Sequence, residues 1–76
     1  AQFSQMGYNY GGLDALNTCL LKGLDVRAFN LEQQADIVED YFRISTGQVP
    51  CWGNGTKADL WLYRKILKPV FEPDHP

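Results

Sequence analysis

The stretch that most constrains this fold runs from Phe29 to Phe42 and reads Phe-Asn-Leu-Glu-Gln-Gln-Ala-Asp-Ile-Val-Glu-Asp-Tyr-Phe. Asn30 is a favourable N-cap residue, and Gln33 can bond back to the backbone amide of the cap, as in a capping box. A helical spacing of about 100° per residue gathers four apolar residues on one narrow arc. These are Leu31, Ala35, Val38 and Phe42, and the residues that widen the arc to about half the circumference are Ile37, Tyr41 and Ile44. We therefore predict a core helix over residues 31–45, buried on its apolar arc.

The opposite arc of this predicted helix is polar and mostly acidic, and we expect it to face solvent. It carries Glu32, Asp36, Glu39, Asp40 and Arg43. Other elements must cover the apolar arc, because propensity alone rarely holds so short a helix in water. Gln34 falls inside the apolar arc, so a buried Gln34 amide would need hydrogen-bond partners from a loop or another helix.

Two further helices are predicted around the core helix. The first covers residues 13–22, where leucines recur at helical spacing and Gly23 is placed to end the helix. The other follows a capping signal at residues 56–59 and ends near Lys68, because Pro69 disfavours helical geometry at the residue before it. The sequence thus predicts an all-α domain of three helices.

The remaining segments are predicted to be irregular. Residues 1–12 are rich in aromatic side chains, and residues 46–55 contain enough Gly and Pro to prevent regular structure. Residues 72–76 resemble an exposed tail. We expect one helical domain or subdomain over residues 1–76, because a chain of 76 residues is too short for two.

Composition limits the classes of function. The net charge is −2, and only Arg64, Lys65 and Lys68 cluster, so we expect no nucleic-acid partner. No apolar run approaches the roughly 20 residues that span a bilayer, so no membrane span is predicted. The chain starts at Ala1 without a signal segment, and we expect it to be a piece of a longer polypeptide.

The two cysteines leave two possibilities open. Cys19 and Cys51 could form one disulfide, and closing a loop of about 33 residues would stabilise the fold by roughly 3–4 kcal/mol. The other possibility is one buried free thiol on the first helix and one loop thiol. Two cysteines are too few for a disulfide scaffold of the small secreted type.

Four aromatic residues are candidates for contacts with a partner protein. They are Tyr8, Tyr10, Trp52 and Trp61. Trp61 lies off the main apolar stripe of the third helix, and aromatic anchors often dominate protein interfaces. For Trp52 the alternative is that it covers the edge of a small core.

The sequence offers little for catalysis beyond carboxylates. The single histidine is His75, which argues against nucleophilic catalysis that needs an imidazole, and two cysteines with one histidine cannot supply four zinc ligands. Glu32 and Asp36 project from one face of the core helix. Either Glu32 is a metal ligand and Asp36 orients a neighbouring ligand, or both belong to a solvated face that suits the helix dipole.

Residues 7–44, and above all Asn30-Leu-Glu-Gln-Gln-Ala35, resemble the C-terminal part of the metallopeptidase-like domains attached to type VI secretion spike (VgrG-related) and Rhs proteins. In such proteins an earlier helix carries His-Glu-x-x-His, and an acidic third ligand follows. The resemblance implies that Glu32 is the third zinc ligand and that Asp36 supports one of the histidines. This chain has no His-Glu-x-x-His, so the resemblance implies a fragment that is inactive alone.

Two functional hypotheses follow. The first is the C-terminal helical part of a zinc-metallopeptidase-like toxin or effector, delivered by a bacterial secretion system, with zinc bound only if the parent protein supplies the histidine motif. The second is a non-enzymatic interaction module that docks on a spike, an immunity-type partner, the rest of its own polypeptide or a second copy of itself. A core helix built for a missing neighbour would expose an apolar patch and favour self-association.

Overall fold

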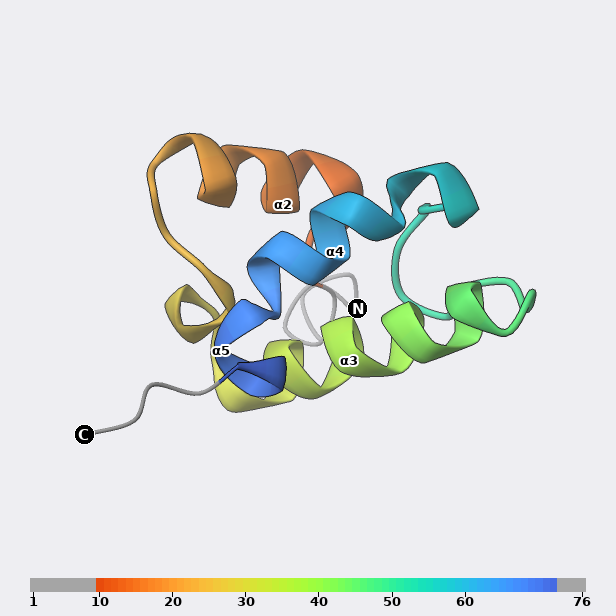
Figure 1. Ribbon diagram of the computed structural model, residues 1–76. Coiled ribbons are helices and arrows are strands. Elements are labelled where there is room, and N and C mark those ends of the chain that lie inside the picture. Colours follow the sequence, from red (N-terminus) through yellow and green to blue (C-terminus); the bar gives the residue numbers. More distant parts are fainter. Residues whose placement is uncertain (1–9, 73–76) are drawn as a thin grey trace.

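The computed structural model describes residues 10–72 and shows an all-α domain in this range, without strands. Three helices form its frame: α2 (Gly12–Leu21), α3 (Leu31–Ser45) and α4 (Leu60–Ile66). A short helix, α5 (Lys68–Phe71), and two 3-10 turns, at Val26–Ala28 and Lys57–Asp59, complete the regular structure. Figure 1 shows α4 lying between α2 and α3, and α4 contacts both of them. The predicted fold class is confirmed.

The core forms where α4 meets the two other helices. Its buried members come from α2, α3 and α4, together with Tyr10, the first 3-10 turn and Leu67, which joins α4 to α5. They are Tyr10, Leu16, Cys19, Val26, Ile37, Ile44, Leu62, Tyr63, Ile66 and Leu67. Tyr10 and Tyr63 pack edge to face, with ring centroids 6.4 Å apart. The short α4 is therefore the element that the other two helices share.

The local signals at the start of α3 act as the sequence predicts. The Asn30 side chain accepts a bond from the Gln33 backbone N–H at 2.8 Å, and the Gln33 side chain accepts from the Asn30 N–H at 3.1 Å. Gln34, partly buried, donates its amide to the Phe29 carbonyl at 2.8 Å. The capping box and the partner that Gln34 required are both present.

The first helix begins with a cap that the sequence did not indicate. Gly11 and Gly12 have φ of +97° and +67°. Gly11 occupies the N-cap position but has no side chain that could cap the helix. Instead the side-chain oxygen of Asn54 accepts from the Leu13 N–H at 3.1 Å. Gly23, with φ of +73°, ends the helix as predicted. The loop that contains Asn54 therefore closes against the start of α2.

The third helix differs from its prediction. The Asp59 carboxylate accepts from the Thr56 N–H at 2.8 Å, so the capping signal is real, but the first turn is a 3-10 turn. The helix ends at Ile66, two residues before the expected end at Lys68. Pro69 then lies in the first turn of α5, where its missing N–H costs nothing. The chain thus begins a second short helix at Lys68 instead of leaving helical structure at Pro69.

The orientation of α3 is the main correction. Ile37 and Ile44 are buried as predicted, but Asp40 is 0% exposed, although its arc was expected to face solvent. Leu31 is 81% exposed and Phe42 54% exposed, although both were expected in the core. The helix is rotated because it packs through Ile37, Asp40 and Ile44. This is possible only because Asp40 finds hydrogen-bond partners inside the fold.

Two predictions concern the ends of the chain, which the described residues include only in part. Glu72 is exposed, as expected for a tail, and residues 73–76 lie outside the described residues. Tyr8 and the rest of residues 1–9 also lie outside them. Between residues 10 and 72, no helix has the length and apolar character needed to cross a membrane.

Candidate functional site

The inward face of α3 holds a buried carboxylate, that of Asp40. It accepts the Tyr10 hydroxyl at 2.7 Å and the backbone N–H of Cys51 at 2.7 Å. The N–H of Trp52 approaches both carboxylate oxygens at 3.2 Å. The Tyr63 hydroxyl bonds that of Tyr10 at 2.5 Å. One side chain of α3 thus ties together the N-terminal segment, the 46–55 loop and α4.

The hydrogen bonds of this cluster have a structural role. Burial raises the pKa of the Tyr10 phenol far above its ordinary value, and its bonds to Tyr63 and Asp40 act in the same direction. Burial likewise raises the pKa of Tyr63. Both phenols therefore stay protonated at neutral pH and donate hydrogen bonds. A Cβ added at Gly53 would collide with the Tyr10 hydroxyl, so the loop must pass close to the cluster.

The predicted metal-ligand pair lies beside this cluster on α3. Glu32 is exposed and Asp36 partly buried. The Oδ2 atom of Asp36 is buried without a hydrogen-bond partner in the described structure. Burial raises the pKa of Asp36, and the charges of Glu39, Asp40 and Glu32 raise it further. Asp36 is thus a carboxylate whose surroundings favour its neutral form.

These acids do not form a metal site by themselves. No group of three or more His, Cys, Asp or Glu side chains in residues 10–72 is arranged to hold a metal ion. Glu39 accepts a bond from the Trp52 indole N–H at 3.3 Å, and Asp40 is occupied by its buried donors. Glu32 remains as one exposed carboxylate, so any zinc site would need its other ligands from outside these residues.

The exposed face of α3 is apolar along its length. Leu31, Ala35, Val38 and Phe42, which we call the outer seam, follow one another at spacings of four, three and four residues. Ala35 is exposed and Val38 only partly buried. Alternating steps of four and three are the spacing by which one helix packs along another. The arc predicted to enter the core is therefore mostly exposed, and only Val38 of the seam packs against the core.

The two edges of the outer seam differ in charge. By helical phase Glu32 and Glu39 border one edge, and Gln34 and Tyr41 border the other. Arg64 donates from Nε to the Tyr41 hydroxyl at 3.2 Å, which brings a cation to that second edge. The seam therefore has one acidic edge and one edge without acidic residues.

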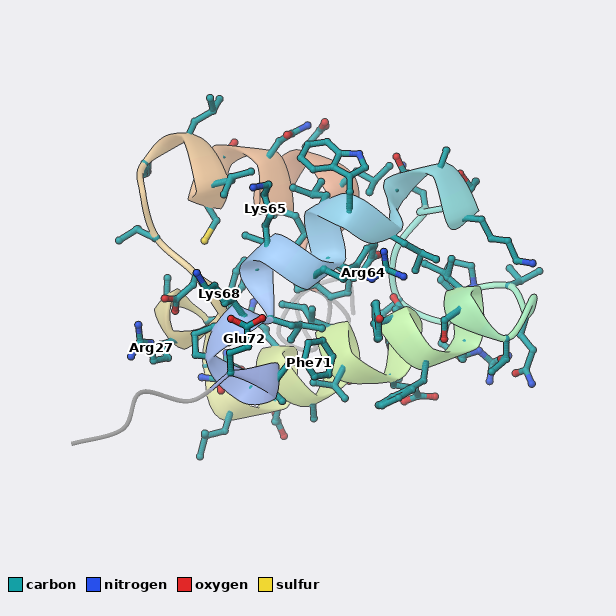
Figure 2. The ribbon with its side chains drawn as sticks, viewed as in Figure 1. Arg27, Arg64, Lys65, Lys68, Phe71 and Glu72 are labelled. Atoms are coloured by element: carbon teal, nitrogen blue, oxygen red, sulfur yellow. The ribbon has the colours of Figure 1, made fainter. Side chains whose placement is uncertain are left out.

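Most positive charge of the described residues lies on α4, α5 and the first 3-10 turn. Figure 2 shows Arg64, Lys65 and Lys68 on one face, with Arg27 nearby. Arg64, Lys65 and Lys68 line a hollow of about 370 Å³ beside Tyr41, Phe71 and Glu72. The rings of Tyr41 and Phe71 lie 5.3 Å apart. Arg27 is held by an ion pair with Asp25 at 2.7 Å. This segregation of charge leaves the acidic edge of the outer seam free of nearby cations from this hollow.

The aromatic candidates divide into buried and accessible residues. Tyr10 is buried and uses its hydroxyl on Asp40, so it is not available on the surface of this fold. Trp52 is 37% exposed and covers part of α3 through its bonds to Asp40 and Glu39. Trp61 is 51% exposed, as its position off the apolar stripe predicted. Tyr8 lies outside the described residues.

Both cysteines are free. Cys19 is buried in the core and donates to the Asp25 carbonyl at 3.3 Å, and Cys51 is exposed in the loop. Burial raises the pKa of Cys19, so its thiol is a poor nucleophile at neutral pH. Of the two possibilities that the sequence left open, the structure shows the free thiols.

Two residues of the buried cluster escaped sequence reasoning. Asp40 was assigned to solvent because a charged residue is almost never fully buried unless it is paired. Tyr63 lies within the predicted third helix, and nothing in its spacing reveals a hydroxyl partner. The local signal was Gly53, because a loop residue without a Cβ atom permits close approach of another side chain.

The chain was compared with protein-family models, with curated proteins and with solved structures, and none of the three comparisons finds a match. Function must therefore be argued from the site itself.

Proposed function

We propose that this chain is a helical protein-interaction module that docks through the outer seam of α3. The observation that supports the proposal is the exposure of Leu31 and Phe42 at the two ends of a regular apolar stripe. Full burial of a side chain of this size contributes roughly 1.5–3 kcal/mol, which a soluble domain gains only when a partner covers it. Scattered apolar residues need no such explanation, but an ordered stripe does.

The fold suits this role because Leu31, Ala35 and Phe42 of the seam are exposed, and only Val38 packs against the domain's own core. α3 is fixed from its other side by Ile37, Ile44 and the bonds to Asp40. The docking helix is therefore anchored from that side, and Leu31, Ala35 and Phe42 can change without removing the core contacts. A pre-organised surface loses little conformational entropy when it binds.

The resemblance of residues 7–44 suggests the setting. On that basis we propose that the partner is another part of the same polypeptide, or a protein of a bacterial secretion system to which an effector or spike of this kind belongs. In either setting the module itself carries out no reaction, and its role is to position the protein to which it is joined.

The test compares the partner proteins that become cross-linked to the wild-type chain and to two variants. Leu31→Ser with Phe42→Ser removes the ends of the seam, and Leu21→Ser is the matched control because Leu21 is 87% exposed on α2. Cross-linked partners should be retained by the control and lost by the double variant. Retention of the same partners by both variants would show that the seam is not the docking surface.

A second candidate function is supported by one observation, the unpartnered Oδ2 of Asp36. We propose that a neighbouring group outside residues 10–72 donates to it, as a histidine ligand would in the zinc-metallopeptidase-like effector that the resemblance implies. Glu32, one turn earlier on α3, would then be one of the zinc ligands. In this arrangement the 76 residues alone bind zinc weakly and have no peptidase activity.

This second candidate can be tested by zinc analysis. The measurement is made on the 76 residues and on a longer polypeptide that joins them to a preceding His-Glu-x-x-His helix, each with and without Glu32→Gln. Stoichiometric zinc only in the longer protein, lost with Glu32→Gln, is the expected result. Zinc that is absent from the longer protein, or that is unaffected by Glu32→Gln, would rule out the ligand role, and Glu39→Gln controls for loss of charge.

A further inference from the structure

The charges that border the outer seam indicate what kind of partner it takes. We infer that the seam binds an amphipathic helix that carries Lys or Arg along the edge facing Glu32 and Glu39. This inference rests on the proposed docking role of the seam and adds the chemistry of the partner. It follows from three observations: the spacing of the seam, the charge of its edges and the poor fit of a second copy.

The spacing of the seam favours a helix as the partner. The four seam residues occupy successive d and a positions of a heptad pattern. They lie within α3, which spans residues 31–45. A helix of this length is about 22 Å long, which suits a partner helix of similar length. Ala35 lies within the stripe, and its small side chain lets a partner backbone approach closely. An extended strand would find no exposed edge on α3 to pair with, because the backbone groups of a helix are bonded internally.

The acidic edge sets the charge of the partner. Glu32 and Glu39 lie one heptad apart, at the positions that meet the flanking residues of a packed helix. Glu39 also accepts a bond from the indole N–H of Trp52 in the 46–55 loop at 3.3 Å. Acidic side chains on the partner would face these glutamates at close range and weaken binding, whereas Lys or Arg would form ion pairs.

A second copy of this chain fits the same edges poorly. In an antiparallel pair of α3 helices, the acidic edge of one copy would meet the acidic edge of the other. In a parallel pair, Glu39 would face Gln34 of the second copy, which offers no charge. Arg43 lies behind Glu39 on the polar arc and donates to the Val49 carbonyl, so neither arrangement places a cation directly opposite Glu32 or Glu39. The charge pattern therefore favours a different helix over self-association.

The test uses three synthetic peptides and the intact 76-residue chain. Each peptide has about three heptads with Leu at the packing positions. One has Lys along one edge and Gln along the other, the second has Glu in place of Lys, and the third is a scrambled version of the first. Binding is measured by titration calorimetry at low and high salt, and the oligomeric state by sedimentation.

We expect the Lys peptide to bind about tenfold more tightly than the Glu peptide at low salt, with the ratio shrinking as salt screens the ion pairs. Glu32→Lys with Glu39→Lys should reverse the preference. Asp14→Lys with Asn17→Lys and Thr18→Lys, which changes the net charge equally at exposed sites on α2, should leave it unchanged. The scrambled peptide should not bind. Leu31→Ser with Phe42→Ser should abolish binding of both helical peptides.

The outcomes separate the two proposals. Equal binding of the Lys and Glu peptides, lost in the seam variant, would leave the docking role intact and overturn the basic partner. If the wild-type chain is a dimer and the Leu31→Ser, Phe42→Ser variant is a monomer, the seam binds a second copy. That result would also keep the docking role and overturn the basic partner. Absence of binding by either helical peptide to a monomeric chain would overturn both proposals.

Discussion

Tyr10 donates its hydroxyl to the buried carboxylate of Asp40 at 2.7 Å, across thirty positions of sequence. The same carboxylate accepts the backbone N–H of Cys51 and Trp52, which places the loop against α3. The orientation of α3 depends on this contact, because Asp40 could not be buried without its donors. The outer seam is exposed for the same reason, since it lies on the far side of the helix.

Removal of the Asp40 carboxylate should destabilise the fold strongly. Asp40→Ala leaves the Tyr10 hydroxyl and two loop N–H groups without an acceptor, and we expect the free energy of unfolding to fall by about 3 kcal/mol. Asp14→Ala, at an exposed site on α2, is the control and should change it by less than about 0.5 kcal/mol. Urea unfolding followed by circular dichroism measures both. A small effect of Asp40→Ala would mean that the cluster does not hold α3 in place.

The buried phenols should make the fold sensitive to alkali. In the unfolded chain tyrosine ionises near pH 10. In the folded chain the pKa values of Tyr10 and Tyr63 are raised, so the folded state holds more protons above pH 10. Stability must therefore fall as the pH rises beyond 10. Tyrosinate absorbance should show these two phenols ionising only as the helical signal is lost. Tyr63→Phe should reduce the loss of stability over this range, measured against Tyr41→Phe.

Asp36 should lower stability at neutral pH. Its pKa is raised above the ordinary value of 3.8, chiefly by burial, so the folded state binds the proton more tightly than the unfolded state. The unfavourable contribution of Asp36 to stability is absent below pH 3.8. It grows as the pH rises from there through the raised pKa of the folded state. Asp36→Asn should therefore gain stability relative to wild type between about pH 4 and pH 7.

The measurement for Asp36 is urea unfolding at a series of pH values. Glu32→Gln is the matched control, since Glu32 is exposed on the same helix. A difference between Asp36→Asn and wild type that stays constant with pH would contradict the raised pKa. In a longer polypeptide that supplies a donor to Oδ2, the sign should change, and Asp36→Asn should then be destabilising.

The cap of α3 should be worth a measurable part of the stability. Asn30→Ala removes the acceptor of the Gln33 N–H, and we expect a loss of about 1 kcal/mol. Asn17→Ala is the control, because Asn17 is exposed within α2, where alanine is the better helix former. Thermal unfolding of the two variants should therefore shift in opposite directions. A loss in both would point to a general effect of removing asparagine.

The sequence by itself determined the local features of this protein. The capping box at Asn30, the stop at Gly23 and the extent of α3 each depend on residues within a few positions of one another. Such signals act through backbone geometry and short-range hydrogen bonds, so they can be read without knowing what lies across the fold. The all-α class followed from the same periodic patterns.

Only the tertiary structure decided which side of α3 is buried. Its apolar residues cover a wide arc, and a helix packed through Ile37 and Ile44 or through Leu31 and Phe42 would satisfy the periodicity equally well. The choice was made by the hydroxyl of Tyr10 and the loop N–H groups, which come from distant positions and make burial of Asp40 favourable. For the same reason Asn54, far along the chain, caps α2. Pairing between residues remote in sequence produces no periodic pattern, and it is this pairing that turns an apolar arc outward, where we propose that it docks a partner.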